Sequence, residues 1–125
     1  MKASRYIYFT DNVGRLVSFY RDVMGMEVIA PPEAMDFDEE GWVQLASGGF
    51  EIGIHRAGKP GSSGRNRNKL VFLVDDVDTI RERLMKQGIR MGKLHTNSKC
   101  CDFKDPDGNI LQISSIGFQS SIPGT

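Results

Sequence analysis

The sequence lacks the features that would direct it to a membrane or to nucleic acid. Its 125 residues carry 16 basic and 16 acidic side chains, so no net charge favours either partner. No uncharged run approaches the roughly 20 residues that span a bilayer, and the start of the chain, Met1 to Arg5, has no apolar signal-peptide core. We therefore expect a cytoplasmic protein.

Cysteine is also scarce. The two cysteines, Cys100 and Cys101, are neighbours in the chain. Adjacent side chains of an extended segment point to opposite faces, so a disulfide between them would be strained. We expect two reduced thiols, and a reactive thiol would need a nearby base that the sequence does not show.

What the sequence does contain is an ordinary apolar fraction of 39%, enough for one core in a single domain. Helical periodicity predicts helices over 13–24 and 77–87, capped by Asn12 and Asp76 and ended by Gly25 and Gly88. Alternation and β-branched or aromatic content predict strands over 5–10, 26–30, 42–46, 50–55, 70–74, near 89–91, 100–103 and 110–114.

The two halves of the chain repeat this order of elements. Thr10-Asp11-Asn12-Val13 and Val74-Asp75-Asp76-Val77 each open a helix, and glycine hairpins at Gly48-Gly49 and Asp107-Gly108 each precede a last strand. Each half is therefore a βαβββ module, and internal duplication is a strong architectural signal. We predict an α+β fold in one domain, with modules at about 4–56 and 69–116, a linker at 57–68 and a tail at 117–125.

Strand alternation separates two sheet faces. One set is uniformly apolar and should pack under the helices: Ile52, Ile54, Leu70, Phe72, Val74, Leu111 and Ile113. The other set is mixed: Arg5, Ile7, Phe9, Glu51, Gly53, His55, Lys69, Val71, Leu73, Ile110, Gln112 and Ser114. A face of mixed character is what the wall of a ligand cavity would present.

Two loops remain open to interpretation. The acidic stretch Glu33 to Glu40 is either a solvated connection or a flap over a pocket, with Met35 and Phe37 facing inward. The stretch Arg56 to Asn68 is rich in glycine, serine and basic residues and is typical of a linker.

Three motifs resemble the vicinal oxygen chelate superfamily of glyoxalases, bleomycin-resistance proteins and extradiol dioxygenases. They are the run from Phe19 to Met26 (FYRDVMGM), the run from Lys104 to Asn109 (KDPDGN) and Val74-Asp75-Asp76-Val77. The resemblance implies two paired βαβββ modules that form a curved mixed sheet around a cleft, with helices on the outer face. It also implies a homodimer.

Enzymes of that superfamily hold a divalent metal with side chains from four strands. The resemblance places those positions on Arg5, about Gly53, Lys69 and Gln112. A guanidinium and an ammonium have no lone pair for a metal, glycine has no side chain, and one amide oxygen is not a site. We therefore expect no metal and no other cofactor. His55 is expected to be a lone cavity or strand-end histidine rather than a metal ligand, and His95 is expected in a polar surface loop.

Several functions stay open. The first is metal-free binding of a small organic molecule; a carboxylate or phosphate group on it would be favoured if the charges of Arg5 and Lys69 stay unpaired. The expected cavity wall comprises Arg5, Phe9, Trp42, Glu51, His55, Lys69 and Gln112. The opposing interpretation is an ion-pair network of Arg5, Glu51 and Lys69 on a wet sheet face.

Catalysis and resistance are the alternatives. Metal-free catalysis would use His55 or Glu51 as general base and Arg5 or Lys69 to stabilise an oxyanion. The resemblance also leaves a lyase, isomerase or dioxygenase of the same superfamily, or an antibiotic-sequestering protein for which the acidic loop suits a cationic drug. A structural or regulatory role remains possible.

Overall fold

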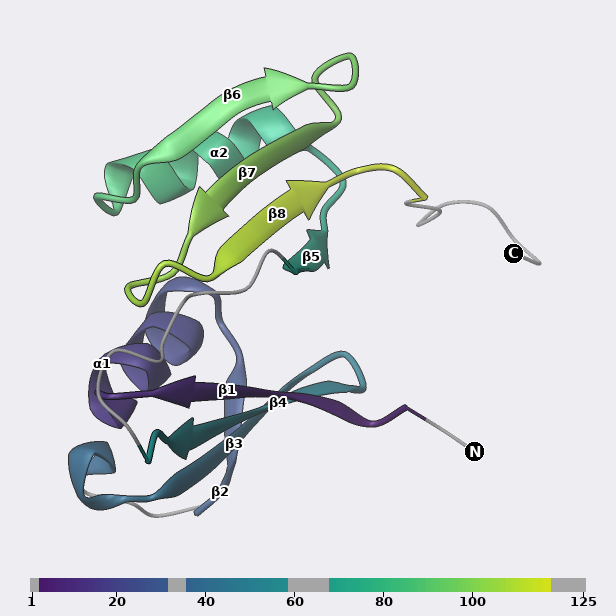
Figure 1. Cartoon of the computed structure of the whole chain (residues 1–125). Coiled ribbons are helices and arrows are strands. Elements are labelled where there is room, and N and C mark those ends of the chain that lie inside the picture. Colours follow the sequence, from purple (N-terminus) through teal and green to yellow (C-terminus); the bar gives the residue numbers. More distant parts are fainter. Residues whose placement is uncertain (1–2, 32–35, 59–67, 118–125) are drawn as a thin grey trace. The chain divides into compact units, whose positions relative to one another are not determined.

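A computed structural model of the chain describes residues 3–31, 36–58 and 68–117 (Figure 1). The chain divides into two compact units, residues 1–65 with 106–108 and residues 66–105 with 109–125. Most of the expected linker, part of the acidic loop including Met35, and most of the expected tail lie outside the described residues. Within the described part of the chain, no helix is long and apolar enough to cross a membrane.

Unit 1 is a βαβββ module. Its elements are β1 (Arg5–Thr10), α1 (Val13–Ser18) continued by the π-helical turn η1 (Phe19–Val23), β2 (Glu27–Ala30), the 3-10 turn η2 (Phe37–Glu39), β3 (Trp42–Ser47) and β4 (Phe50–Arg56). The strands form one mixed sheet in the order β1-β4-β3-β2, in which β1 runs parallel to β4 and the other neighbours are antiparallel.

Unit 2 repeats this plan. Its elements are β5 (Lys69–Leu73), α2 (Val77–Lys86), β6 (Met91–His95), β7 (Cys100–Lys104) and β8 (Ile110–Ser114). The sheet order is β5-β8-β7-β6, again with its first pair parallel. The predicted duplication and the α+β fold class are therefore confirmed.

The strand registers align the two units residue by residue. Arg5 is the partner of Glu51 in unit 1, and Lys69 is the partner of Ile110 in unit 2. Two residues further along β4 and β8 stand Gly53 and Gln112. Arg5 is therefore equivalent to Lys69, and Gly53 is equivalent to Gln112.

The helices begin where the sequence predicts. The side chain of Asn12 accepts a hydrogen bond from the Arg15 N–H at 3.0 Å, and Asp76 accepts one from the Thr79 N–H at 3.2 Å. Each bond satisfies an N–H that has no partner inside the first helical turn. After the first helix, Gly25 takes a positive φ of 76° and turns the chain into β2.

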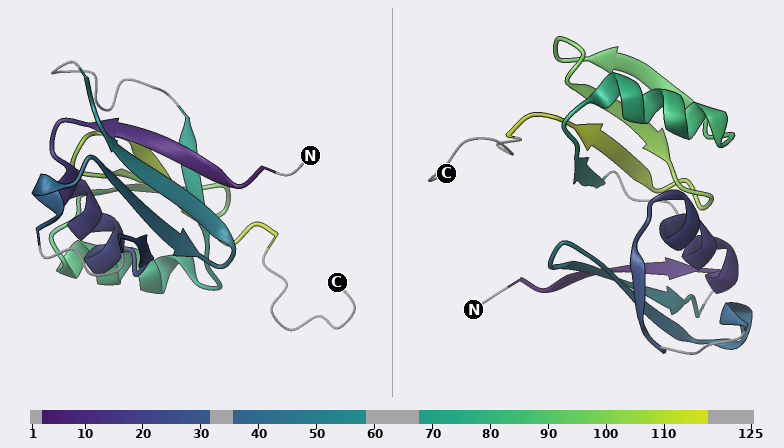
Figure 2. Two further views of the ribbon diagram at one scale, coloured as in Figure 1. Left: turned by 90° about the horizontal axis from the view of Figure 1, so that it is seen from below. Right: turned by 180° about the vertical axis from the view of Figure 1, so that it is seen from behind.

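Each sheet buries one face against its helix (Figure 2). In unit 1 the buried apolar side chains are Tyr8, Val13, Leu16, Val17, Phe19, Tyr20, Met26, Val43, Leu45, Ile52 and Ile54. In unit 2 they are Val77, Leu84, Cys100, Cys101, Phe103, Leu111 and Ile113. Most of the predicted apolar set is fully buried; Leu70, Phe72 and Val74 are half-buried.

The predicted strand near 89–91 was misplaced, because β6 starts at Met91 and extends to His95. The helix end accounts for the difference: the N–H of Ile89 donates to the Leu84 carbonyl and that of Gly88 to the Met85 carbonyl, both at 3.0 Å. Ile89 thus belongs to the C-terminal cap of α2. His95, expected in a loop, ends β6 and is exposed as expected.

The described part of the acidic loop packs beside α1. A carboxylate oxygen of Asp38 accepts from the Gly14 N–H at 2.9 Å, and the Arg56 guanidinium donates to the Asp38 and Glu40 carbonyls. The Phe37 ring lies 5.3 Å from the Arg21 guanidinium carbon. Phe37 therefore packs on the helix side of unit 1, where it lines a hollow beside α1.

Candidate functional site

The candidate site is the face of the unit 1 sheet that α1 does not cover, which we call the open face. Strand alternation places nine residues of β1, β3 and β4 on it: Arg5, Ile7, Phe9, Trp42, Gln44, Ala46, Glu51, Gly53 and His55. It contains five of the seven predicted wall residues. The other two, Lys69 and Gln112, lie on the corresponding face of unit 2.

Three aromatic side chains form one row across this face. Phe9, His55 and Trp42 are register partners on three adjacent strands. The Phe9 and His55 ring centroids are 5.1 Å apart, and those of His55 and Trp42 are 6.1 Å apart and nearly perpendicular. We call this set the aromatic row.

Gly53 lies next to the aromatic row, beneath the Trp42 side chain. A Cβ atom built on Gly53 would overlap Cη2 of the Trp42 indole. The Gly53 backbone is buried although it has no side chain of its own. The absence of a side chain at position 53 is therefore what lets the indole cover this strand.

Polar side chains stand at the other end of the open face. The Arg5 Nε lies 3.6 Å from a Glu51 carboxylate oxygen, and the Gln44 amide donates to that same oxygen. The Arg5 guanidinium also lies 6.0 Å from the centroid of the Trp42 ring. Arg5 thus has an anionic partner and an aromatic one, as the ion-pair interpretation expects for this residue.

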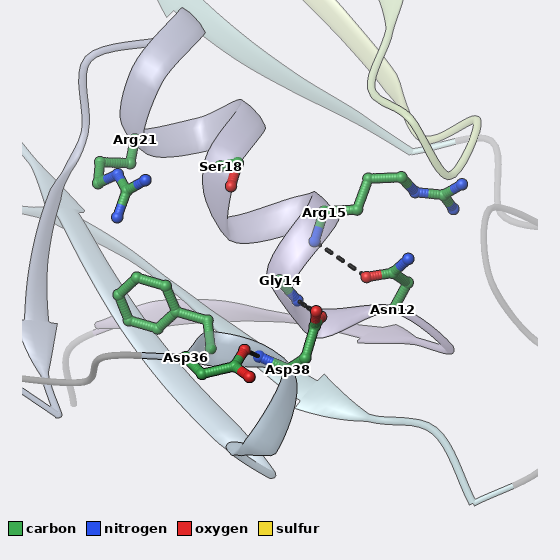
Figure 3. A pocket seen from close by; sticks show the side chains of 8 residues that line it. Asn12, Gly14, Arg15, Ser18, Arg21, Asp36 and Asp38 are labelled. Carbon is green, nitrogen blue, oxygen red and sulfur yellow. Dashed lines mark hydrogen bonds between the residues drawn. The ribbon is translucent and has the colours of Figure 1, made fainter.

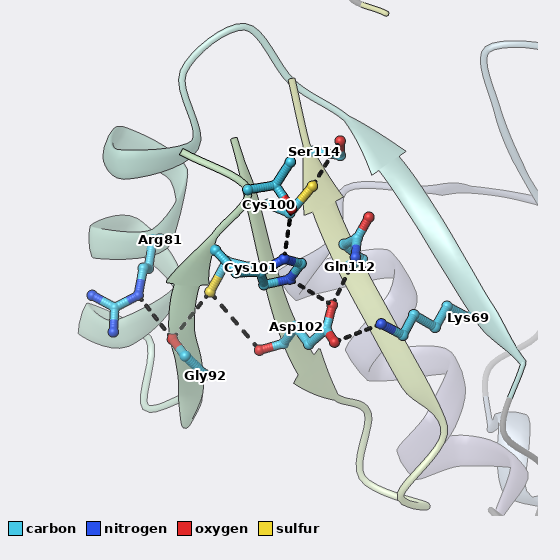
Figure 4. Close-up of polar contacts among 10 residues, drawn as sticks. Lys69, Arg81, Gly92, Cys100, Cys101, Asp102, Gln112 and Ser114 are labelled. Carbon is cyan, nitrogen blue, oxygen red and sulfur yellow. Dashed lines mark hydrogen bonds and ion pairs between the residues drawn. The ribbon is translucent and has the colours of Figure 1, made fainter. Parts of the chain in front are cut away.

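On unit 2, polar groups from three strands, β5, β6 and β8, converge on Asp102 of β7 (Figure 4). The Lys69 Nζ lies 2.7 Å from Oδ2, the Gln112 amide donates to Oδ1 at 2.9 Å, and the His95 Nε2 lies 3.7 Å from Oδ1. Burial disfavours the charged form of Asp102. The bonds from Lys69 and Gln112 and the charges of Lys69 and His95 outweigh that effect and hold the pKa of this carboxyl below its ordinary value.

The two cysteines point to opposite sides of β7. The Cys100 Sγ lies 3.4 Å from the Ser114 hydroxyl, whereas the Cys101 thiol donates to the Gly92 carbonyl at 3.2 Å (Figure 4). Both are free and buried. Burial raises the pKa of Cys101 even though Arg81 lies near it, which makes it a poor nucleophile.

A separate hollow lies beside α1, in unit 1 (Figure 3). It has a volume of about 580 Å³ and is lined by Asn12, Gly14, Arg15, Ser18, Arg21, Asp36, Phe37 and Asp38. Two of its lining side chains have partners: the Asp38 carboxylate accepts from the Gly14 N–H, and the Arg21 guanidinium lies 2.7 Å from Asp22 and over the Phe37 ring. We assign it a structural role in holding the acidic loop.

The residues at the superfamily's metal positions do not fit a metal. Arg5 and Lys69 present a guanidinium and an ammonium beside carboxylates, Trp42 covers Gly53, and the Gln112 amide donates to Asp102. Among the described residues, no three His, Cys, Asp or Glu side chains are grouped so that they could hold a metal ion. The residues at these four positions therefore do not form the donor set that a divalent cation needs.

Three polar residues that interact with the predicted wall residues or with one of their partners were not themselves predicted as wall residues: Gln44, Asp102 and His95. Gln44 contacts Glu51, and Asp102 contacts both Lys69 and Gln112. His95 lies beside Asp102. The signal that could have found Gln44 and Asp102 is strand pairing, since both stand across from the last strand of their unit. Ser114 was expected on the mixed face and is buried there.

Solved structures with the same fold come from several functional classes. One is a lactoylglutathione lyase from Agrobacterium tumefaciens, with 19% identity, TM-score 0.68 and coverage of 90% of this chain and 92% of the other. Another is TnmS3, an antibiotic-binding protein from a Streptomyces species, with 19% identity, TM-score 0.67 and coverage of 91% and 94%. A third is the fosfomycin resistance protein FosX from Mesorhizobium loti, with 18% identity, TM-score 0.67 and coverage of 91% and 90%.

At these identities the likeness establishes the fold alone. Among curated protein sequences, none matches significantly. The sequence model of one family, however, matches residues 2–113, which is nearly the whole chain. The chain therefore belongs to the Glyoxalase/Bleomycin resistance protein/Dioxygenase superfamily.

Proposed function

We propose that this chain binds a small organic molecule on the open face of unit 1, without a divalent metal. The observation that carries the proposal is the exposed apolar surface there. Ile7 is 42% and Phe9 51% exposed, and they stand beside Trp42 and His55 on the same face. Grouped exposed apolar side chains with polar groups at their edge are typical of a surface that another molecule covers.

The metal-free part of the proposal rests on the donor set. A guanidinium, an ammonium, a glycine and one amide occupy the four positions from which superfamily enzymes hold their metal. Two of these groups are cations that have no lone pair to offer a metal. A ligand on this face must therefore be recognised by apolar contact, stacking and hydrogen bonds.

Selectivity for an anionic ligand would require an unpaired cation. Arg5 lies beside Glu51, and Lys69 lies beside Asp102. These pairs remove the basis for expecting a carboxylate or phosphate group, so the proposed ligand is not restricted to anions. Homodimer formation and a cytoplasmic location stay predictions from the sequence and its resemblance.

The relatives support a small-molecule ligand in general terms. TnmS3 is an antibiotic-binding protein, FosX a fosfomycin resistance protein and the Agrobacterium protein a lactoylglutathione lyase. They share the fold and differ in function, so they support only the proposal that this chain binds a small molecule, and not which molecule it binds. Antibiotic sequestration stays an alternative; of the acidic loop, the Asp38 carboxylate accepts from the Gly14 N–H of α1, whereas Asp36 and Glu39 are exposed.

The His55 imidazole favours a second candidate, metal-independent proton transfer. The His55 Nδ1 lies 2.7 Å from the Arg56 carbonyl oxygen, which can only accept, so Nδ1 carries the proton. This bond leaves the lone pair of Nε2 available to take a proton from a bound substrate. Incubation of the protein with a bound ligand in D2O tests this candidate. Deuterium incorporation into the ligand that depends on His55 supports catalysis. Without such incorporation, only the binding proposal stands.

A metabolite-library thermal-shift screen, run with chelator and with added divalent metals, tests the binding proposal. A ligand of the folded state raises Tm, by an amount that grows with its concentration relative to Kd. We expect stabilising compounds in chelator. Phe9→Ser should abolish their effect, whereas Phe50→Ser, which removes an exposed aromatic ring from the other face of β4, should preserve it. Compounds that stabilise Phe9→Ser as strongly as the parent would contradict the proposed site.

A further inference from the structure

The Trp42 side chain is the largest planar group on the open face, and the sheet beneath it is built to receive it. Its indole covers Gly53, at a position where any Cβ would overlap the ring. Trp42 is only half-buried, so part of the indole stays accessible to solvent. The resemblance to superfamily enzymes also places one of their metal-ligand positions at about Gly53.

The groups around the indole leave it suited to a neutral aromatic partner. His55 meets it edge-on, and Phe9 continues the row beyond His55. The Arg5 guanidinium 6.0 Å from the ring is compensated by Glu51. A cationic ligand would compete with Arg5 for the same ring, whereas a planar aromatic ring adds stacking and edge-to-face contacts with the row.

We propose that Trp42 replaces the missing metal as the principal ligand contact, and that the ligand presents a planar aromatic ring to it. This inference rests on the proposed function and adds the ligand class. Gly53 is the positioning residue, because it keeps the indole against the strand. A saturated ring of the same size would gain burial on this surface without the electrostatic complementarity of two aromatic rings.

The chain offers a direct reporter, because Trp42 is its only tryptophan. An amide-detected NMR spectrum of labelled protein therefore contains one indole N–H signal. We would titrate a naphthamide probe and, separately, its fully saturated decalin carboxamide into the chelator-treated protein. The two probes share a head group and differ in aromaticity.

The expected result is a saturable shift of the indole signal by naphthamide, with a Kd roughly three- to tenfold lower than that of the decalin probe. Trp42→Leu lacks the indole signal, so its Kd values are read from the backbone signals of Ile7 and Phe9; this variant should lose the preference for naphthamide. Gly53→Ala should weaken naphthamide binding as well, because the added methyl group displaces the indole, and Phe50→Leu should change nothing. If Gly53→Ala does not fold, Trp42→Leu still decides the question.

Equal affinity for the two probes, or naphthamide binding that survives Trp42→Leu unchanged, overturns the inference. The proposed function then stands if both probes still perturb the backbone signals of Ile7 and Phe9. Failure of naphthamide to bind at its solubility limit also overturns the inference, and the library screen then judges the proposed function independently. The two claims therefore fail in distinguishable ways.

Discussion

Charged side chains on the open face of unit 1 and on the corresponding face of unit 2 have partners of opposite charge nearby. Arg5 lies beside Glu51, and Asp102 contacts Lys69 and Gln112 with His95 close by. These groups are partly exposed, so each pair stabilises the fold only modestly. Their consequence for function is larger, because they neutralise the cations that occupy the superfamily's metal positions.

The lowered pKa of Asp102 makes its contribution to stability dependent on pH. A carboxyl with a folded-state pKa below the unfolded value of about 4 stabilises the fold above that pH, and the contribution is lost as pH falls through the folded pKa. We predict that Asp102→Asn lowers the free energy of unfolding at neutral pH by less than about 1 kcal/mol. The deficit should shrink below pH 4 in urea denaturation.

The control for that experiment is Glu82→Gln, which removes an exposed carboxylate from α2 with the same change of charge. Its effect should be smaller at neutral pH. An Asp102→Asn deficit that stays constant from neutral to acidic pH would contradict the ionic account.

Among the elements, α1 depends on its N-terminal cap. The Asn12 side chain accepts from the Arg15 N–H, a bond that alanine cannot make. Asn12→Ala should therefore lower the free energy of unfolding by about 1 kcal/mol, and Asn12→Asp should retain most of it. Chemical denaturation of the three proteins measures the difference; equal stability of the alanine variant would show that the cap is dispensable.

Because α1 contacts the acidic loop, substitutions at Gly14 and Asp38 should have non-additive effects on the free energy of unfolding. Glycine to alanine in a helix normally gains about 0.5 to 1 kcal/mol. A Cβ on Gly14, however, would overlap the Asp38 carboxylate, which accepts from the Gly14 N–H. We expect Gly14→Ala to show this gain only when Asp38→Ala is also present. Identical effects in both backgrounds, measured by a double-mutant cycle, would exclude the steric account.

Most elements were predictable because their signals are local. Asn12 with Gly25, and Asp76 with Gly88, bracket the two helices, and alternation locates the strands. The π-helical turn at Phe19–Val23 carries no such signal. The start of β6 was missed because the cap of α2 takes Ile89, and that depends on hydrogen bonds to the preceding turn.

At the scale of the whole molecule, the two units expose the same positions. Ile7 and Phe9 on β1 correspond to Val71 and Leu73 on β5, and all four are among the exposed large apolar residues. An exposed apolar side chain that serves binding should contribute little to the free energy of unfolding. We predict that Phe9→Thr changes the free energy of unfolding by no more than about 0.5 kcal/mol.

The matched control is Ile54→Ala, on the buried face of the neighbouring strand. It should cost about 2 to 5 kcal/mol, because it opens a cavity in the core. Thermal or chemical denaturation compares the two. A cost for Phe9→Thr that approaches that of Ile54→Ala would mean that Phe9 serves the fold.

The candidate site was only partly predictable. Residue types at Arg5, Lys69 and Gln112 argued against a metal from the sequence alone, and alternation placed Phe9 and His55 on one face. Trp42 covers Gly53, and Lys69, Gln112 and His95 surround Asp102, only because side chains from different strands come into contact. That information comes from register and rotamers, which a single sequence does not carry.

Calorimetric titration of the chelator-treated protein with the most stabilising library compound, repeated with a divalent metal present, tests the central claim most directly. The account predicts the same Kd in both conditions, about one ligand bound per chain, and loss of binding in Phe9→Ser. Binding that requires stoichiometric metal, or that is at least tenfold tighter with it, would contradict the account.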